Sequence, residues 1–345
     1  MVKRAACAQV PAAVISQGTN PPDWRLTVMT QKNEQTDAGT AARTRHIGLE
    51  LEFAGLTEAE AALVFADAVD GTARQSDARR WVCETQEFGA CEVYLDTRFD
   101  DKIAELGKAA EHLMREVVPV ELVTEPFDPR HLPLFNDGTA ALRDAGAIGS
   151  RDGILLGFGL HLNVEIAEET ADHLGRVLTS YALLEEHFRA KDPIDVSRRV
   201  LPFVQPYPDS LVDALGRGIP DTLDGLIDLY LDHAPTRDHG LDMLPIFKGI
   251  DADKVSDAVH GLTAVKPRPA YHFRLPDCRI DEDGWSVMPA WDCWNTVEAV
   301  ASDAPLLTAL RKARRDWTGL PKLGRKPWHK EVATILDTTS ERDVS

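Results

Sequence analysis

The feature that most constrains the fold is an alternation of apolar and ionisable residues in segments that resemble β-strands. In GLELEF, which ends at Phe53, three apolar residues alternate with Glu50 and Glu52. Successive side chains of a strand point to opposite faces, so one face is apolar and the other carries both carboxylates. A sheet built from such strands buries its apolar face and gathers its charges on the other.

Other segments repeat this alternation. Their polar-face residues are His161, Asn163 and Glu165 in GLHLNVEI, His272 and Arg274 in YHFRL, and Glu92, Tyr94 and Asp96 in CEVYLDT. The phase slips at Pro276, which is typical of a bulge, and Asp277 and Arg279 line up after it. The pattern therefore predicts several strands with ionisable faces.

A solvated outer face would explain the alternation of any single strand. Such faces favour Thr, Lys, Gln and Ser, whereas these strands carry Glu-x-Glu, His-x-Asn-x-Glu and Asp-x-Arg. Neighbouring carboxylates repel one another unless a cation lies between them. Carboxylates with one His and one Asn suit Mg²⁺ or Mn²⁺ better than zinc, and arginines suit phosphate or a substrate carboxylate. We interpret the polar face as a phosphoryl-transfer site without a P-loop.

Composition narrows the function classes. The 345 residues have a net charge of -18, which makes a nucleic-acid partner unlikely on electrostatic grounds. No apolar run is long enough for a membrane span. The five cysteines form no C-x-x-C pair, which fits a cytoplasmic protein.

The chain is expected to form one domain with two appended segments. We expect a flexible N-terminal leader over residues 1–41, a single catalytic domain over 42–318, and a loose basic C-terminal tail over 319–345. The capping-box spacing of Thr57 and Glu60 predicts a helix start, and residues 100–118 form an amphipathic helical pattern. Paired strands with helices between them favour an α+β fold with a mainly antiparallel sheet.

The segments HIGLELEFAGL, VPVELVTEPF, GFGLHLNVEI and YHFRLPDCRI follow one another in this order. In this the chain resembles the putative amidoligases of the carboxylate–amine ligase superfamily, which includes glutamine synthetase and glutamate–cysteine ligase. The resemblance implies a curved antiparallel sheet that holds ATP and two or three Mg²⁺ ions, with Mn²⁺ as an alternative, and helices packed outside it.

The resemblance also implies roles for individual residues. The implied metal ligands are Glu50, Glu52, His161 and Asp277, with Asp277 replacing the usual glutamate. The implied nucleotide-binding residues are Asn163, Arg268 and Arg274. The implied catalytic residues are Arg274, Arg279, Glu121 and Asp96. For the acid that deprotonates the amine, Glu121, Glu125 and Asp96 remain alternatives.

The expected function is an ATP- and Mg-dependent ligase that joins a carboxylate to an amine through an acyl phosphate. Its substrates would be an amino acid, a peptide or a related small molecule, with no nucleic-acid or membrane partner; a homo-oligomer is left open. A metal-dependent hydrolase that uses the same carboxylates and histidine is the alternative. A catalytically lapsed binding protein is a third interpretation.

Overall fold

The computed structural model describes residues 45–95, 119–150, 157–200, 204–259, 265–319, 323 and 325–342. The chain divides after residue 41, and Ala42–Ser345 form one compact unit. The expected leader and the helix expected over residues 100–118 lie outside the described residues.

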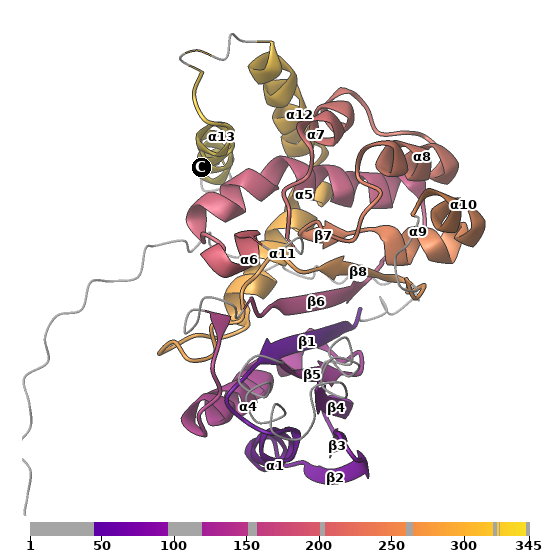
Figure 1. Cartoon of the computed structure of the whole chain (residues 1–345). Coiled ribbons are helices and arrows are strands. Elements are labelled where there is room, and N and C mark those ends of the chain that lie inside the picture. The colour runs from indigo at the N-terminus through magenta and orange to yellow at the C-terminus, as the bar shows by residue number, and fades with distance from the viewer. Residues whose placement is uncertain are drawn as a thin grey trace, which may run out of the picture. The chain divides into compact units, whose positions relative to one another are not determined.

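The described strands form one eight-stranded sheet. They are β1 (Ile47–Phe53), β2 (Thr72–Asp77), β3 (Arg80–Thr85), β4 (Gly89–Leu95), β5 (Val120–Thr124), β6 (Leu160–Glu165), β7 (Leu241–Asp242) and β8 (Ala270–Phe273). Their order is β2-β3-β4-β5-β1-β6-β8-β7, and every neighbouring pair is antiparallel (Figure 1). The predicted α+β class with an antiparallel sheet is confirmed.

Helices fill most of the connections between strands. They are α1 (Glu58–Ala68), η2 (Pro129–His131), α4 (Leu132–Asp144), α5 (Ala171–Lys191), α6 (Val196–Val200), α7 (Asp209–Arg217), α8 (Leu223–His233), α9 (Leu244–Ile250), α10 (Ala252–Ala258), α11 (Met288–Ser302), α12 (Ala304–Thr318) and α13 (Trp328–Arg342). The capping box at the start of α1 is confirmed: Thr57 Oγ1 accepts from the Glu60 N–H at 3.2 Å, and Glu60 Oε2 accepts from the Thr57 N–H at 2.9 Å.

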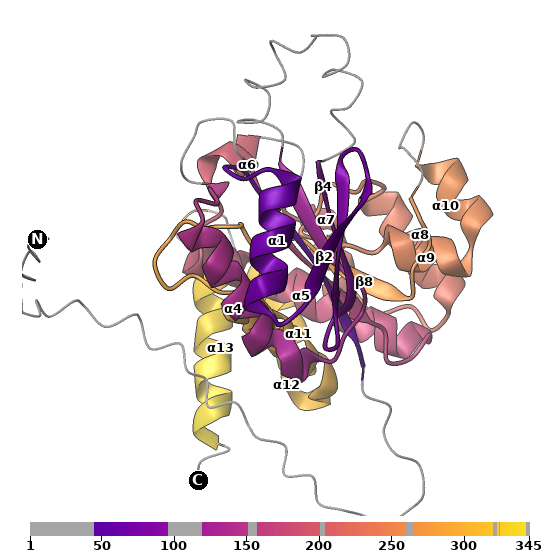
Figure 2. The same cartoon turned by 90° about the horizontal axis from the view of Figure 1, so that it is seen from below.

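The apolar face of the sheet carries the core. Leu49, Leu51 and Phe53 of β1 are fully buried. Near β2–β4 this core continues into α1 and α4 (Figure 2). There the Phe65 and Phe135 rings meet edge-on with centroids 5.5 Å apart. Near β6 and β8 it continues into α11 and α5. The helices thus cover the face predicted to be apolar and leave the polar side chains on the other.

Strand register brings the polar residues side by side. Glu50 on β1 lies opposite His161 on β6, and Asn163 on β6 lies opposite His272 on β8. Opposite residues of antiparallel strands point to the same face, with their Cβ atoms roughly 5 Å apart. Neighbouring strands therefore present their ionisable residues on one shared surface.

The C-terminal segment differs from the expected loose tail. Helix α13 occupies Trp328–Arg342, and its Trp328, Val332 and Leu336 are buried at a spacing of four residues. Trp328 Nε1 donates to the Leu183 carbonyl of α5 at 2.9 Å. This apolar stripe packs the helix against the rest of the fold. The basic residues that precede the helix made the segment resemble a loose tail in the sequence.

None of the helices in the described part of the chain combines the length and apolar character that crossing a lipid bilayer requires.

Candidate active site

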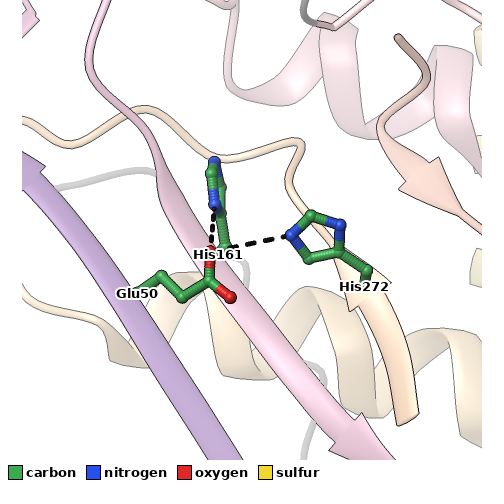
Figure 3. A group of neighbouring side chains, drawn as sticks. All are labelled: Glu50, His161 and His272. Atoms are coloured by element: carbon green, nitrogen blue, oxygen red, sulfur yellow. Dashed lines mark hydrogen bonds and ion pairs between the residues drawn. The ribbon is translucent and has the colours of Figure 1, made fainter. Parts of the chain in front are cut away.

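Glu50 lies at the centre of the polar face and contacts four side chains. Its Oε1 accepts from Asn163 Nδ2 at 2.9 Å and from Arg268 Nη1 at 3.0 Å. Its Oε2 lies 3.2 Å from His161 Nδ1 and 3.8 Å from His272 Nε2 (Figure 3). The two oxygens thus have different surroundings: one faces an amide and a guanidinium, and the other faces two imidazoles.

Asp242 on β7 contacts the imidazole of His272 at Nδ1, the nitrogen on the far side of the ring from Glu50. Its Oδ2 lies 3.4 Å from His272 Nδ1 and accepts from Arg237 Nε at 2.9 Å, and its Oδ1 accepts from the Leu244 N–H at 3.0 Å. Burial opposes ionisation of Asp242, but the hydrogen bond with His272 and the charge of Arg237 lower its pKa to about 2. An ionised carboxylate only accepts, so Asp242 accepts from Nδ1 of His272.

The electrostatics place an ionised carboxylate beside a neutral imidazole at neutral pH. Burial would raise the pKa of Glu50, but the hydrogen bonds with His161 and His272 hold it well below its usual range. Burial lowers the pKa of His161 to about 4, against the pull of Glu50. A carboxylate therefore lies between two imidazoles, of which His161 is neutral, and this environment favours a cation.

The separations fit ligands of one metal ion. Two ligand atoms that each lie about 2.1 Å from an ion are about 3.0 Å apart at a right angle and about 3.4 Å apart at a tetrahedral angle. The observed separations from Glu50 Oε2 are 3.2 and 3.8 Å, and one ligand atom from each of Glu50, His161 and His272 lies within 4.8 Å of the others. Small side-chain movements would let these three residues hold one ion.

Two further carboxylates lie beside this centre. Glu52 of β1 and Glu121 of β5 occupy directly opposite positions, with Tyr94 of β4 opposite Glu121. Glu52 Oε2 accepts from the Gly159 N–H at 2.8 Å. Burial raises the pKa of Tyr94, and the neighbouring Glu121 raises it further. An oxygen-rich surface therefore continues from the Glu50 centre across β1 towards β4.

Arg274 contributes buried positive charge to the same region. Its Nη1 donates to the Arg237 carbonyl at 2.7 Å, whereas its buried Nε has no hydrogen-bond partner among the described residues. Burial lowers the pKa of Arg274, and the charges of Asp242 and Glu52 oppose this. The charge of Arg274 in turn disfavours protonation of His161.

Asp277 and Arg279 form a cluster of ion pairs that borders the Glu50 centre at Gly159, where Arg198 Nη2 and His161 Nε2 both lie close to the backbone. Asp277 Oδ1 accepts from Arg198 Nη1 at 2.8 Å, and its Oδ2 accepts from the Asp195 N–H at 2.7 Å. Arg279 contacts that carboxylate at 3.4 Å and Asp192 at 2.7 Å. Asp277 follows the end of β8 and pairs with Gly159 in an isolated bridge, so its carboxylate faces α6.

A model of the protein family described as "Putative amidoligase enzyme" matches residues 43–296. The match spans more than half of the 345 residues and includes every strand of the sheet. The chain belongs to this amidoligase family. Searches of curated proteins and of solved structures each found no match to this chain.

The structure brings some of the predicted site residues into contact and places others apart from them. Glu50 contacts His161, Asn163 and Arg268, and Arg268 also donates to Asn163. Glu52, Glu121 and Arg274 lie on adjoining parts of the face. Asp277 and Arg279 lie in the bordering cluster of ion pairs, and Asp96 lies outside the described residues.

Sequence reasoning missed three residues of this region as site residues. His272 was placed on a polar face, but its contact with Glu50 depends on the pairing of β6 with β8. Asp242 lies in a segment whose sequence is typical of a turn, and β7 is only two residues long. Arg198 lies in a short helix, and nothing in its local sequence indicates the ion pair with Asp277.

Proposed function

We propose that this face is the active site of an ATP- and metal-dependent ligase that joins a carboxylate to an amine. The observation that carries the proposal is the convergence of Glu50, His161 and His272, with Arg268 on the same carboxylate, in a member of the amidoligase family. Metal ligands beside arginines are what phosphoryl transfer requires when no P-loop is present. The substrates proposed are an amino acid, a peptide or a related small molecule.

The proposed ligase reaction has two steps. An oxygen of the substrate carboxylate attacks the γ-phosphorus of ATP, and ADP leaves with the electrons of the broken P–O bond. The amine nitrogen then attacks the acyl carbon, inorganic phosphate leaves, and the nitrogen loses a proton to give the amide. Phosphorylation is needed because a carboxylate otherwise has only oxide as a leaving group.

The chain's own residues divide the work of the first step. Glu50, His161 and His272 would hold a divalent ion, which when bound supplies positive charge beside the nucleotide phosphates. Arg268 has a side chain that is 38% exposed and is attached to Glu50 through one nitrogen, so its remaining donors can reach a phosphate. Arg274 would stabilise charge that develops on the transferred group.

Glu52 and Glu121 complete the proposed site. Their opposite positions on β1 and β5 would suit a second ion held by oxygens alone. Of the acids considered for the amine proton, Glu121 lies on the polar face beside Tyr94, and Glu125 accepts from the Ala90 N–H at the start of β4. We therefore propose Glu121 as the proton acceptor.

Asp277 and Arg279 have a different proposed role. Through Asp192, Asp195 and Arg198 they would hold the segment that leads into α6, rather than contact the reacting groups.

The test is a reaction with ATP, a divalent metal and pooled amino acids, in which phosphate release and new amide masses are measured together. Glu50→Gln keeps the side-chain shape and removes the charge, so we expect it to abolish both signals. Glu84→Gln, which alters an exposed partner of Arg74 on β3, is the matched control and should leave them unchanged. Full activity of the Glu50 variant would contradict the proposal, and hydrolysis of an added amide without ATP, with no amide formed, would favour the hydrolase.

A further inference from the structure

A cavity of about 440 Å³ lies on the face of the sheet opposite the Glu50 centre. Its apolar floor consists of Ile47 of β1 and Val164 of β6, which are buried and occupy opposite positions on the apolar face. Cavities of this size are typical of small-molecule sites. None of the residues proposed for the ligase reaction is among the described residues that line it, so that reaction gives the cavity no role.

Helix α11 supplies one wall of the cavity. Trp291, Asn295 and Glu298 are spaced by four and then three residues, so they form one stripe along the helix. The stripe presents an aromatic ring, an amide and a carboxylate in that order. Within the described part of the chain, the side-chain amide of Asn295 has no hydrogen-bond partner, so it can bond a ligand.

Two ion pairs give the cavity both signs of charge. Arg45 donates to Glu298 through both terminal nitrogens, and Arg130 Nη2 donates to Asp128 at 2.8 Å. The carboxylates are the more buried partners, with side chains 18% and 15% exposed, whereas the Arg130 side chain is 82% exposed. The formal charges of these four residues cancel. A zwitterion therefore matches the cavity better than a ligand with a single charge does.

Two buried donors next to the lining residues lack a partner. Tyr271 of β8 lies opposite Val164, Trp294 precedes Asn295 on α11, and the centroids of the two rings are 5.0 Å apart. Both residues are fully buried, and among the described residues neither Tyr271 Oη nor Trp294 Nε1 has a hydrogen-bond partner. Buried polar atoms almost always find a partner. A ligand carboxylate, directly or through an ordered water, would supply the missing acceptor.

We propose that this cavity binds an aromatic amino acid as its zwitterion. The aromatic side chain would pack on Trp291 and the apolar floor, because aromatic rings attract one another beyond the area that they bury. The ammonium group would interact with Glu298, and the carboxylate with Arg130 and Asn295. Binding here would not depend on the ligase reaction of the opposite face.

The experiment measures binding of L-phenylalanine to the full chain by calorimetric titration, without ATP or metal. We expect a dissociation constant below about 1 mM. Two analogues test the charges, since 3-phenylpropionate lacks the ammonium group and phenethylamine lacks the carboxylate. Each should bind at least about tenfold more weakly, because it loses a hydrogen-bonded charge. Glycine keeps both charges and should also bind at least about tenfold more weakly, because it buries no ring.

Variants assign the binding to the cavity. Arg130→Gln changes an exposed side chain, so the fold should tolerate it; it should weaken L-phenylalanine binding but leave phenethylamine binding unchanged. Trp291→Ala should weaken binding of every ligand that carries a phenyl ring. Arg143→Gln, at the pair with Asp144 on α4, is the matched control and should leave the affinity unchanged. Glu50→Gln, on the opposite face, should also leave it unchanged.

Three results would overturn the inference. The first is no binding of L-phenylalanine at millimolar concentration, and the second is an analogue that binds as tightly as L-phenylalanine. The third is binding that is lost in Glu50→Gln but kept in Arg130→Gln and Trp291→Ala, which would place the amino acid on the polar face as a substrate. Amide formation by a chain that fails these tests would reject the second site and sustain the ligase. Binding that passes them in a chain that forms no amide would do the reverse.

Discussion

Replacing Asp277 with asparagine separates a structural role from a metal-binding one. The family resemblance implies that Asp277 is a metal ligand, whereas the structure pairs it with Arg198 at 2.8 Å. The side chains of Asp277 and Arg198 are only 1% and 2% exposed. We expect Asp277→Asn to lower the free energy of unfolding and to leave the Mn²⁺ affinity of the folded protein unchanged.

The size of the loss follows from what Arg198 retains. Breaking a buried ion pair by removing one partner typically costs about 3–5 kcal/mol. Arg198 would still donate to the carbonyls of Pro276 at 2.7 Å and Arg274 at 2.9 Å. Asparagine at position 277 keeps one acceptor oxygen. Its NH₂ group cannot accept, so one of the present donors, such as the Asp195 N–H, loses its acceptor. The lower end of the range, about 3 kcal/mol, is therefore expected.

Urea unfolding followed by circular dichroism measures this loss, and calorimetric Mn²⁺ titration of the folded protein measures affinity. Asp316→Asn, at the exposed i,i+4 pair with Lys312 on α12, is the control and should change stability by no more than the error of the measurement. If Asp277→Asn is as stable as the wild type but binds Mn²⁺ weakly, Asp277 belongs to the metal site and our reasoning is wrong.

Two further predictions concern stability. Burial lowers the pKa of His187 in the folded state, so the unfolded chain binds a proton at this residue more readily. The contribution of neutral His187 to the free energy of unfolding should therefore be complete above about pH 6.5 and should decrease as the pH falls below it. Urea midpoints of His187→Gln should therefore decline less than those of the wild type between neutral and mildly acidic pH, and parallel declines would disprove the assignment. Trp328→Ala removes a buried ring and its bond to Leu183, and should lower the free energy of unfolding by about 3–5 kcal/mol; an unchanged urea midpoint would mean that α13 contributes nothing to the fold.

The period of two made the faces of single strands predictable from the sequence. Glu50 and His161 were assigned to polar faces because apolar residues flank each of them. The pairing that places them opposite one another joins residues more than a hundred positions apart, and local sequence does not encode that register.

Two features of the site could not be read from local sequence. The family resemblance implies that Asp277 is a metal ligand, and this stays a prediction; β8 ends at Phe273, and the ion pair of Asp277 with Arg198 could not be read from local sequence. Asp242 was not identified because a two-residue strand is too short to show a period.

The most direct test of the metal-centred site is anomalous diffraction from crystals grown with Mn²⁺. We predict a peak about 2.2 Å from Glu50 Oε2 and from a ring nitrogen of both His161 and His272. A peak at Asp277, or none near Glu50 at saturating Mn²⁺, would contradict the account.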